Sequence, residues 1–346
     1  MDRIDFRSDT VSWPTPAMRA AMAQANVGDD VYGEDPTVIE LEALAAAKTG
    51  MEAGLFVASG TMGNLTAILT HAQRGEAAIV GLDAHTFAHE AGGMAALGGI
   101  VPHPLITDEY GRFSLADIHN ALPPDDPHYA PASLILVENS YGAKGGYPLP
   151  PDYFAEIRQI ANIHNLKVHM DGARLFNAAV ALNLDASKLT QHVDSVTFCL
   201  SKGLCAPVGS VLCGSTGFIN RARRTRKLLG GGMRQAGVLA AAGIISLNEM
   251  VERLDDDHRH ARQLAEGLSA IPGIELNLDN VRTNMVFFNL SDDLPIAPDA
   301  FLDALRAEAN IWLGSVGGRS FRAVTHYWIG EEEVELFLQI VERVIR

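Results

Sequence analysis

The chain has 346 residues, 47% of them hydrophobic, so it can bury a large core, and its length suggests about two domains. Its 27 basic and 42 acidic side chains give a formal net charge of -15, which argues against nucleic acid or an anionic membrane surface as a partner. No apolar run is long enough to span a membrane, and the charged residues 1–10 do not resemble a secretory signal.

Short apolar segments typical of buried strands alternate with segments of helical spacing through much of the chain. The expected strands cover 53–60, 76–84, 132–140, 166–173, 194–202 and 209–215. The expected helices include 62–75, 151–165 and 175–184. Because strands rich in Val, Ile, Leu and Phe are typical of parallel sheets covered on both faces, this alternation predicts a doubly wound, mostly parallel α/β sheet.

The pattern changes after Leu254. A helix with a polar face is expected over 255–271, and a last amphipathic helix begins at Glu331. Between them we expect strands at 274–278, 284–290 and 321–329 and a helix near 299–310. The sequence therefore predicts a large domain over 1–250 and a smaller C-terminal α+β domain over 251–346.

The three cysteines, Cys199, Cys205 and Cys213, lie close together in apolar surroundings. An odd count without a C-x-x-C pattern suits no disulfide framework or metal motif. We therefore expect buried free thiols in a reducing, cytoplasmic compartment.

Three features lie at the ends of expected strands, where parallel sheets gather their functional groups. Ser59, Gly60 and Thr61 open a helix, which suits either a phosphate or an ordinary N-cap. Asp171 suits a metal ligand, a cap or a partner for a protonated ring nitrogen. Lys202 suits a solvent-directed or paired ammonium, or a lysine that forms a Schiff base.

Together, a phosphate cradle, an aspartate and a later lysine are the set that binds pyridoxal 5'-phosphate (PLP). The lysine holds the cofactor aldehyde, the aspartate keeps the ring nitrogen protonated, and His85, at another strand end, would cover the ring. There is no G-x-G-x-x-G or G-x-x-x-x-G-K-[ST] motif to favour a dinucleotide or P-loop site.

A metal site is the alternative near His85. His85 and His89 lie four residues apart, beside Glu90, but the order is not H-E-x-x-H and no third ligand is evident in the sequence. The acidic segment 28–36 lacks the alternating oxygen ligands of an EF-hand. We therefore expect no metal.

At this level of detail the chain resembles the L-threonine aldolase family of fold type I PLP enzymes, in its low-specificity and L-allo-threonine group. The matching motifs run in order from Arg7 to His326 and include "RSDTVSWPTPAMRAAM", "LFVASGTMGNL", "HMDGARLFNA", "LSKGLCAPVGS", "LLGGGMRQAG" and "FRAVTH". The resemblance implies an aspartate-aminotransferase-like fold and a homodimer or homotetramer whose active sites are shared between subunits.

The resemblance also implies roles for residues. Cofactor binding is implied for Ser59, Gly60, Thr61, His85, Asp171, Arg174, Ser201, Lys202, Lys227 and Arg234, of which Lys227 and Arg234 would come from a neighbouring subunit. Substrate binding is implied for Ser8, Arg174 and Arg322, since a planar guanidinium binds a carboxylate through two hydrogen bonds. Catalytic roles are implied for Lys202 and His85.

One position departs from the family pattern. Where the family often reads "ENTHN", this chain reads "ENSYG", so Tyr141 replaces a histidine that faces the substrate hydroxyl. Tyr141 is a candidate catalytic residue, but a reference pKa near 10 makes a tyrosine a poor base, and a bound water or His85 could serve instead. Cys205 stands where the family usually has glycine.

The implied reaction is cleavage of L-threonine or L-allo-threonine, as small-molecule substrates, to glycine and acetaldehyde. Other PLP reactions at the same carbon remain open: a phenylserine-type aldolase, a racemase, a β-eliminating lyase or an aminotransferase. A non-catalytic binding module is a further alternative, which the presence of Lys202, Asp171, Arg174 and Arg322 argues against.

Overall fold

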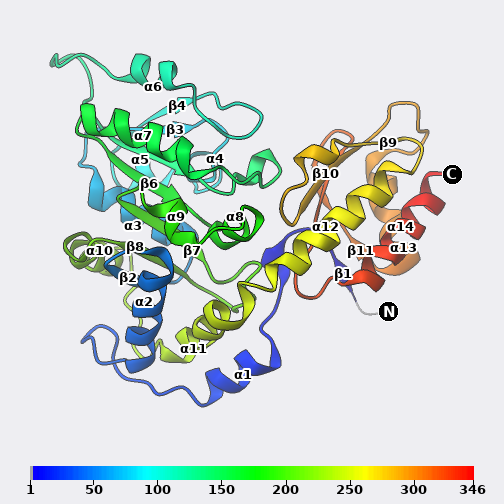
Figure 1. Cartoon of the computed structure of the whole chain (residues 1–346), viewed down its shortest axis with the longest axis horizontal. Coiled ribbons are helices and arrows are strands. Elements are labelled where there is room, and N and C mark those ends of the chain that lie inside the picture. The colour runs from blue at the N-terminus through cyan, green and yellow to red at the C-terminus, as the bar shows by residue number, and fades with distance from the viewer. Residues whose placement is uncertain (1–2) are drawn as a thin grey trace.

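A seven-stranded sheet forms the centre of the larger lobe of the computed structural model, which describes residues 3–346 (Figure 1). In spatial order its strands are β2 (Ala53–Val57), β8 (Ser210–Gly214), β7 (Ser195–Cys199), β6 (Lys167–Asp171), β5 (Ala132–Glu138), β3 (Ala77–Gly81) and β4 (Val101–Leu105). β8 runs antiparallel to both of its neighbours, β2 and β7, and the other neighbouring strands pair in parallel. The predicted α/β fold with a mostly parallel sheet is confirmed.

Helices cover this sheet, because its central strands are apolar and buried along their whole length. The longer helices are α2 (Pro36–Thr49), α3 (Gly60–His71), α7 (Pro151–Ile163), α10 (Thr216–Leu228) and α11 (Gly237–Ile245). The shorter ones are α1 (Pro16–Ala23), α4 (His85–Ala88), α5 (Gly93–Ala96), α6 (Leu115–Ala121), α8 (Leu175–Ala181) and α9 (Ala186–Thr190), with single turns η1 (Asp9–Val11) and η2 (Gly142–Lys144).

The smaller lobe has a four-stranded antiparallel sheet and three helices, at the right of Figure 1. Its strands, in spatial order, are β12 (Gly314–Gly317), β13 (Ser320–Val324), β10 (Met285–Leu290) and β9 (Ile274–Glu275). Its helices are α12 (Leu254–Ser269), α13 (Pro298–Ala309) and α14 (Glu331–Ile345), with a turn η4 (Leu278–Asn280); η3 (Ser246–Met250) leads into this lobe.

One strand of the smaller lobe is shorter than expected. The sequence pattern favours a strand over 321–329, but β13 ends at Val324. Beyond it, the Thr325 hydroxyl donates to the carbonyl oxygen of Asp257 (2.6 Å), and His326 Nε2 lies 3.0 Å from the carbonyl oxygen of Asp5. These hydrogen bonds pair the buried side chains of Thr325 and His326 with backbone carbonyls outside the sheet, so the strand ends before them.

The N-terminal segment begins in the smaller lobe. β1 (Ile4–Asp5) pairs in parallel with β11 (Ile311–Trp312) and lies among the orange and red elements of Figure 1. Phe6 is fully buried against Phe337, with ring centroids 4.8 Å apart. The division at residues 250 and 251 stays a prediction, and residues 4–6 pack with the second part of the chain.

Among the described residues, every helix is too short or too polar to cross a membrane. The three cysteines are free and buried.

We expect Phe6→Ala to lower the free energy of unfolding by about 3–5 kcal/mol, because it leaves a cavity in the core of the smaller lobe. Urea denaturation measures this change. Leu228→Ala, at a side chain that is 81% exposed, is the control and should stay within about 0.5 kcal/mol of the parent protein. Equal effects of the two variants would show that residues 4–6 are not anchored in that core.

Candidate active site

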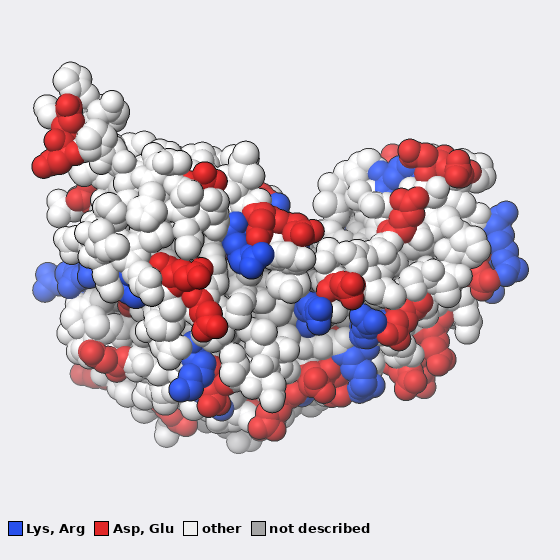
Figure 2. Space-filling view, turned by 45° about the horizontal axis from the view of Figure 1, so that its top comes forward, with Lys and Arg blue, Asp and Glu red and all other residues white. Residues whose placement is uncertain are grey.

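A cavity of about 480 Å³ lies between the lobes, where the carboxyl ends of β5 and β6 face the smaller lobe. Figure 2 shows the surface hollowed between the two lobes. The predicted site residues that line the cavity are Ser8, His85, Asp171, Arg174, Lys202 and Arg322. The structure therefore brings together residues that are more than 300 positions apart in the chain.

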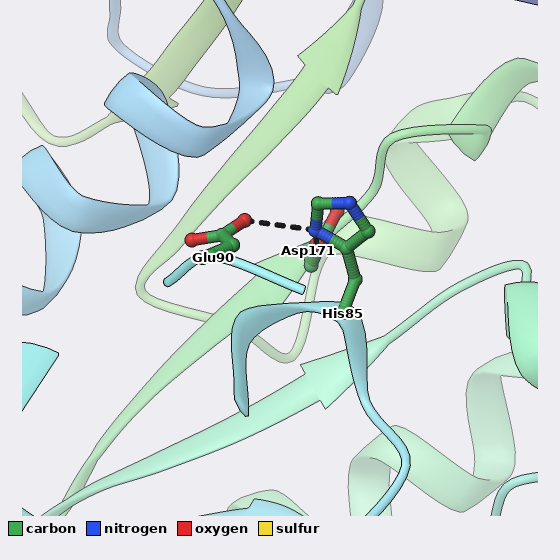
Figure 3. A group of neighbouring side chains, drawn as sticks. All are labelled: His85, Glu90 and Asp171. Atoms are coloured by element: carbon green, nitrogen blue, oxygen red, sulfur yellow. Dashed lines mark hydrogen bonds and ion pairs between the residues drawn. The ribbon is translucent and has the colours of Figure 1, made fainter. Parts of the chain in front are cut away.

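His85 lies against two carboxylates, as Figure 3 shows. Its Nδ1 is 2.9 Å from Glu90 Oε1 and 3.9 Å from Asp171 Oδ2, and its backbone N–H donates to Glu138 (2.8 Å). The hydrogen bond to Glu90 raises the pKa of His85. Burial raises the pKa of Glu90, and burial together with the charge of Asp171 raises the pKa of Glu138 to about 7.

Asp171 brings a third potential metal-binding group beside His85 and Glu90, whereas His89 is not part of this cluster. The ligand atoms of His85, Glu90 and Asp171 lie within 4.8 Å of one another, so the three side chains could hold a metal ion. Asp171 comes from a strand far from the other two in sequence, which is why spacing alone missed it. The absence of a metal stays a prediction.

Asp171 ends β6 and is almost fully buried. Its Oδ1 accepts a hydrogen bond from the backbone N–H of Ala173 (3.0 Å), and its Oδ2 accepts one from the side-chain amide of Asn64 (2.8 Å). These donors hold the carboxylate at the cavity wall, as a partner for a cationic ring nitrogen requires.

Arg174 forms a buried ion pair with Asp9, a partner that the sequence did not identify. Its Nε and Nη2 donate to the two oxygens of Asp9 at 2.7 and 2.6 Å. Burial alone would raise the pKa of Asp9, but the Arg174 charge and hydrogen bonds hold that pKa well below its usual range. The Nη1 group of Arg174 takes no part in this pair and is available to a ligand.

Arg322 lies near Arg174 on the other side of the cavity, on β13. Its Nη2 donates to the carbonyl oxygen of Arg7 (3.1 Å), and among residues 3–346 no carboxylate forms an ion pair with it. Burial, and then the charge of Arg174, lower its pKa. A ligand carboxylate between the two guanidiniums would relieve this repulsion.

The predicted phosphate residues, Ser59, Gly60, Thr61 and Ser201, do not line the cavity. The Ser59 hydroxyl accepts from the backbone N–H of Met62 (3.2 Å) and caps α3, which packs against β7. A Cβ at Gly60 would lie only 3.0 Å from Cys199 Sγ, so glycine lets the first turn of α3, with Thr61, approach the end of β7. Ser201 follows that strand directly.

Lys227 and Arg234 lie outside this cavity. Arg234 Nη1 pairs with Asp29 (2.9 Å), and the Arg234 side chain is 54% exposed. Lys227 ends α10. Their contribution to a neighbouring subunit's site stays a prediction.

Tyr141 is not among the residues that line the cavity. Its ring is buried under Gly111, where a Cβ would lie 2.3 Å from the ring, and its hydroxyl donates to Asp83 Oδ1 (2.8 Å). Burial raises its pKa. Asp83, which also pairs with Lys144 (2.5 Å), lines the cavity. A catalytic role for Tyr141 stays a prediction, and the hydroxyl of Tyr141 is connected to the cavity through Asp83.

Four residues at or beside the cavity were not predicted from the sequence. Glu138 ends β5, so the strand-end rule that found Asp171 could have found it. Asp9 and Asn64 lie inside the matched motifs, but their partners are distant in sequence. Asp83 could be recognised only from the direction of the Tyr141 side chain.

The site fits PLP on the chemistry of its donors. Lys202 and Asp171 line one cavity, and the N-terminus of α3, which begins at Gly60, presents backbone N–H groups of the kind that bind a phosphate. The buried hydroxyl of Ser140 also lines the cavity and has no hydrogen-bond partner among the described residues. Such an orphaned polar group is expected where a polar ligand binds.

A mostly parallel sheet covered by helices, with these groups at its strand ends and a second lobe beside them, defines the fold type I class of PLP-dependent enzymes. The family model of the beta-eliminating lyases matches residues 5–291. The probable low-specificity L-threonine aldolase 2 of Arabidopsis thaliana is 43% identical over 99% of this chain and 97% of its own length. The low specificity L-threonine aldolase of Escherichia coli is 43% identical over 96% of each chain.

A solved structure of a threonine aldolase from Leishmania major has a TM-score of 0.83 at 21% identity and covers 99% of this chain and 100% of its own, which establishes the shared fold. The chain therefore belongs to the low-specificity L-threonine aldolases within the beta-eliminating lyase family.

We expect Glu90→Gln to lower the pKa of His85 in the cofactor-free protein, because the charged partner of Nδ1 is lost. NMR titration of the His85 Cε1 proton measures this change. Since folding raises the pKa of His85 above 6.5, its contribution to stability is complete below that value and declines as pH rises through the folded pKa. Glu266→Gln, at an exposed ion pair, is the control; a His85 pKa equal in both variants would contradict the assignment.

We expect Asp9→Asn to reduce the free energy of unfolding by about 3–5 kcal/mol at neutral pH, because Arg174 is left buried without a charged partner. Folding lowers the pKa of Asp9, so its stabilisation is present above the ordinary value of 3.8 and is lost as pH falls through the folded pKa. The deficit should therefore shrink in acid. Denaturation across pH measures it, and a loss as small as that of Glu266→Gln, about 1 kcal/mol or less, would refute it.

Proposed function

We propose that this protein is a PLP-dependent aldehyde-lyase that cleaves L-threonine and L-allo-threonine to glycine and acetaldehyde. The observation that carries the proposal is the convergence of Lys202, Asp171 and the Arg174–Arg322 pair on one cavity. The names of the relatives support the substrate class, since the Arabidopsis thaliana and Escherichia coli proteins are low-specificity L-threonine aldolases.

The cofactor would be held at several points. The amine of Lys202 would bind its aldehyde, Asp171 its ring nitrogen and His85 its ring face. Its phosphate would lie at the first turn of α3, against Ser59, Gly60, Thr61 and Ser201. When bound, PLP supplies an electron sink for the charge that develops as a bond to the amino acid Cα breaks.

The arginines would select which bond breaks. Arg174 and Arg322 face the same part of the cavity, and Ser8 adds a hydroxyl beside them. A carboxylate held between two guanidiniums fixes the rotation of the amino acid about its Cα. Holding the Cα–Cβ bond in the reactive direction favours aldol cleavage over proton loss.

The β-hydroxyl proton needs an acceptor on the cavity wall. Asp83 lines the cavity, and Tyr141, Thr107 and Lys144 all donate to its carboxylate. We therefore assign Tyr141 a positioning role, with Asp83 accepting a hydrogen bond from the β-hydroxyl directly or through water. His85 remains the second candidate acceptor.

A homodimer or homotetramer is part of the proposal. Lys227 and Arg234 are cationic and lie outside the cavity of their own chain, which suits residues that reach the phosphate of a neighbouring site. The three buried free cysteines support a reducing, cytoplasmic location. Beta-elimination is the second candidate reaction, because the matching family model is that of the beta-eliminating lyases.

Coupled aldehyde detection across L-threonine, L-allo-threonine, L-serine and L-phenylserine tests the proposal. We expect acetaldehyde and glycine from both threonine isomers and no turnover by Lys202→Ala, with Lys48→Ala as an exposed control. Arg322→Lys should lower kcat/KM roughly ten- to a hundredfold, because the planar two-point contact is lost. Racemisation, a keto acid or ammonia release without acetaldehyde would refute aldolase activity.

A further inference from the structure

A line of hydrogen-bonded side chains leads from Asp171 away from the cavity, between α3 and the strands β6 and β7. The side-chain amide nitrogen of Asn64 lies 2.8 Å from both Asp171 Oδ2 and Glu90 Oε1. Asn64 Oδ1 lies 3.1 Å from His169 Nε2, and His169 Nδ1 lies 2.8 Å from Ser195 Oγ. The line ends at His71, whose Nε2 is 2.7 Å from the same hydroxyl.

The chemistry of each group fixes the direction of these hydrogen bonds. Carboxylates accept, so the Asn64 amide must turn its NH₂ group toward Asp171 and Glu90. Its carbonyl oxygen then accepts from His169 Nε2–H. A neutral imidazole has one donor, so His169 Nδ1 accepts from the Ser195 hydroxyl, whose oxygen in turn accepts from His71 Nε2–H. Every donor therefore points toward the two carboxylates.

Both histidines are in the state that this direction requires. Burial lowers the pKa of His169 to about 3 and that of His71 to about 4, so each ring is neutral at physiological pH. A charged His169 would have no acceptor for the Ser195 hydroxyl. The line cannot relay protons, because the Asn64 side chain cannot take up a proton at its oxygen and release one from its nitrogen. The line therefore acts on Asp171 electrostatically.

The line occupies some of the most protected space in the protein. Asn64, His169 and Ser195 are each at most 1% exposed. Hydrogen bonds that all point the same way polarise one another in such a low-dielectric interior. Their dipoles therefore add at the Asp171 carboxylate. Glu90 shares the Asn64 amide and also binds His85, which places two buried carboxylates on one donor.

We propose that Asn64 and His169 are positioning residues that orient Asp171 and support its negative charge, so that it binds a protonated cofactor ring nitrogen. Ser195 and His71 act one step further away, because they fix the tautomer of His169. This inference rests on the proposed cofactor role of Asp171 and extends it to residues that do not line the cavity.

The alternative is a purely structural role. The same bonds join α3 to β6 and β7, so they could do no more than hold the helix on the sheet. The two roles differ in what they require of the cofactor: an effect through Asp171 needs a ring nitrogen, whereas a packing effect does not.

The experiment compares the affinity of the cofactor-free protein for PLP and for its 1-deaza analogue, in which C–H replaces the ring nitrogen. We expect Asn64→Leu and His169→Phe to weaken PLP binding roughly tenfold or more and to change binding of the analogue far less. Ser195→Ala should have a smaller effect in the same direction, of about twofold. Thr66→Val, also buried on α3 but with no hydrogen-bond partner for its hydroxyl among residues 3–346, should change neither affinity.

A second readout follows the charge directly. The ¹⁵N chemical shift of PLP labelled at its ring nitrogen should move toward the unprotonated value in Asn64→Leu and His169→Phe and should stay in place in Thr66→Val. Equal losses of affinity for PLP and the analogue, with an unchanged ¹⁵N shift, would overturn the inference in favour of a structural role.

Asp171→Asn separates this inference from the proposed function. If that variant alters PLP affinity and the ¹⁵N shift while the Asn64 and His169 variants match Thr66→Val, the inference is wrong and the cofactor role stands. If Asp171→Asn alters neither quantity, the cofactor role of Asp171 is itself wrong.

Discussion

The buried ion pair between Asp9 and Arg174 is the interaction on which the cavity depends. It joins the N-terminal segment to the residues that follow β6, and Asn284 of the smaller lobe adds a hydrogen bond to Asp9 (3.3 Å). Burying two charges costs free energy unless each is paired and hydrogen-bonded. Moving Asp9 away from Arg174 would therefore destabilise the protein. The pair therefore fixes the position of Arg174 relative to the N-terminal segment and the smaller lobe. The Nη1 group of Arg174 takes no part in the pair and can bind a ligand.

Charge is separated along the cavity that this contact holds. Asp171, Glu138 and Glu90 gather around His85 at one end, whereas the other end carries Arg174, which is paired with Asp9, and Arg322, whose pKa is lowered by burial and by the charge of Arg174. A cationic ring nitrogen suits the first end and a carboxylate suits the second. The line of hydrogen bonds from His71 to Asn64 contributes to this separation of charge, because its donors point toward Asp171 and Glu90 from the side away from the cavity.

Much of the fold and part of the site could be predicted from the sequence. Alternating apolar strands and helices indicate the sheet, and strand ends locate Asp171, His85 and Lys202. The reversed direction of β8 could not be predicted, because a buried antiparallel strand has the same apolar pattern as a parallel one. The Tyr141 substitution was visible in the sequence, but not the rotamer that turns its hydroxyl to Asp83. Cys205, at a φ of 62°, lies in the backbone region that explains a glycine there in the family.

Borohydride reduction of the PLP-saturated protein, followed by peptide mapping, tests most directly whether this cavity holds the cofactor on Lys202. We predict one reduced pyridoxyl adduct, on the peptide that carries Lys202, and no adduct in Lys202→Ala. An unlabelled Lys202, or label spread over exposed lysines such as Lys48, would contradict the account.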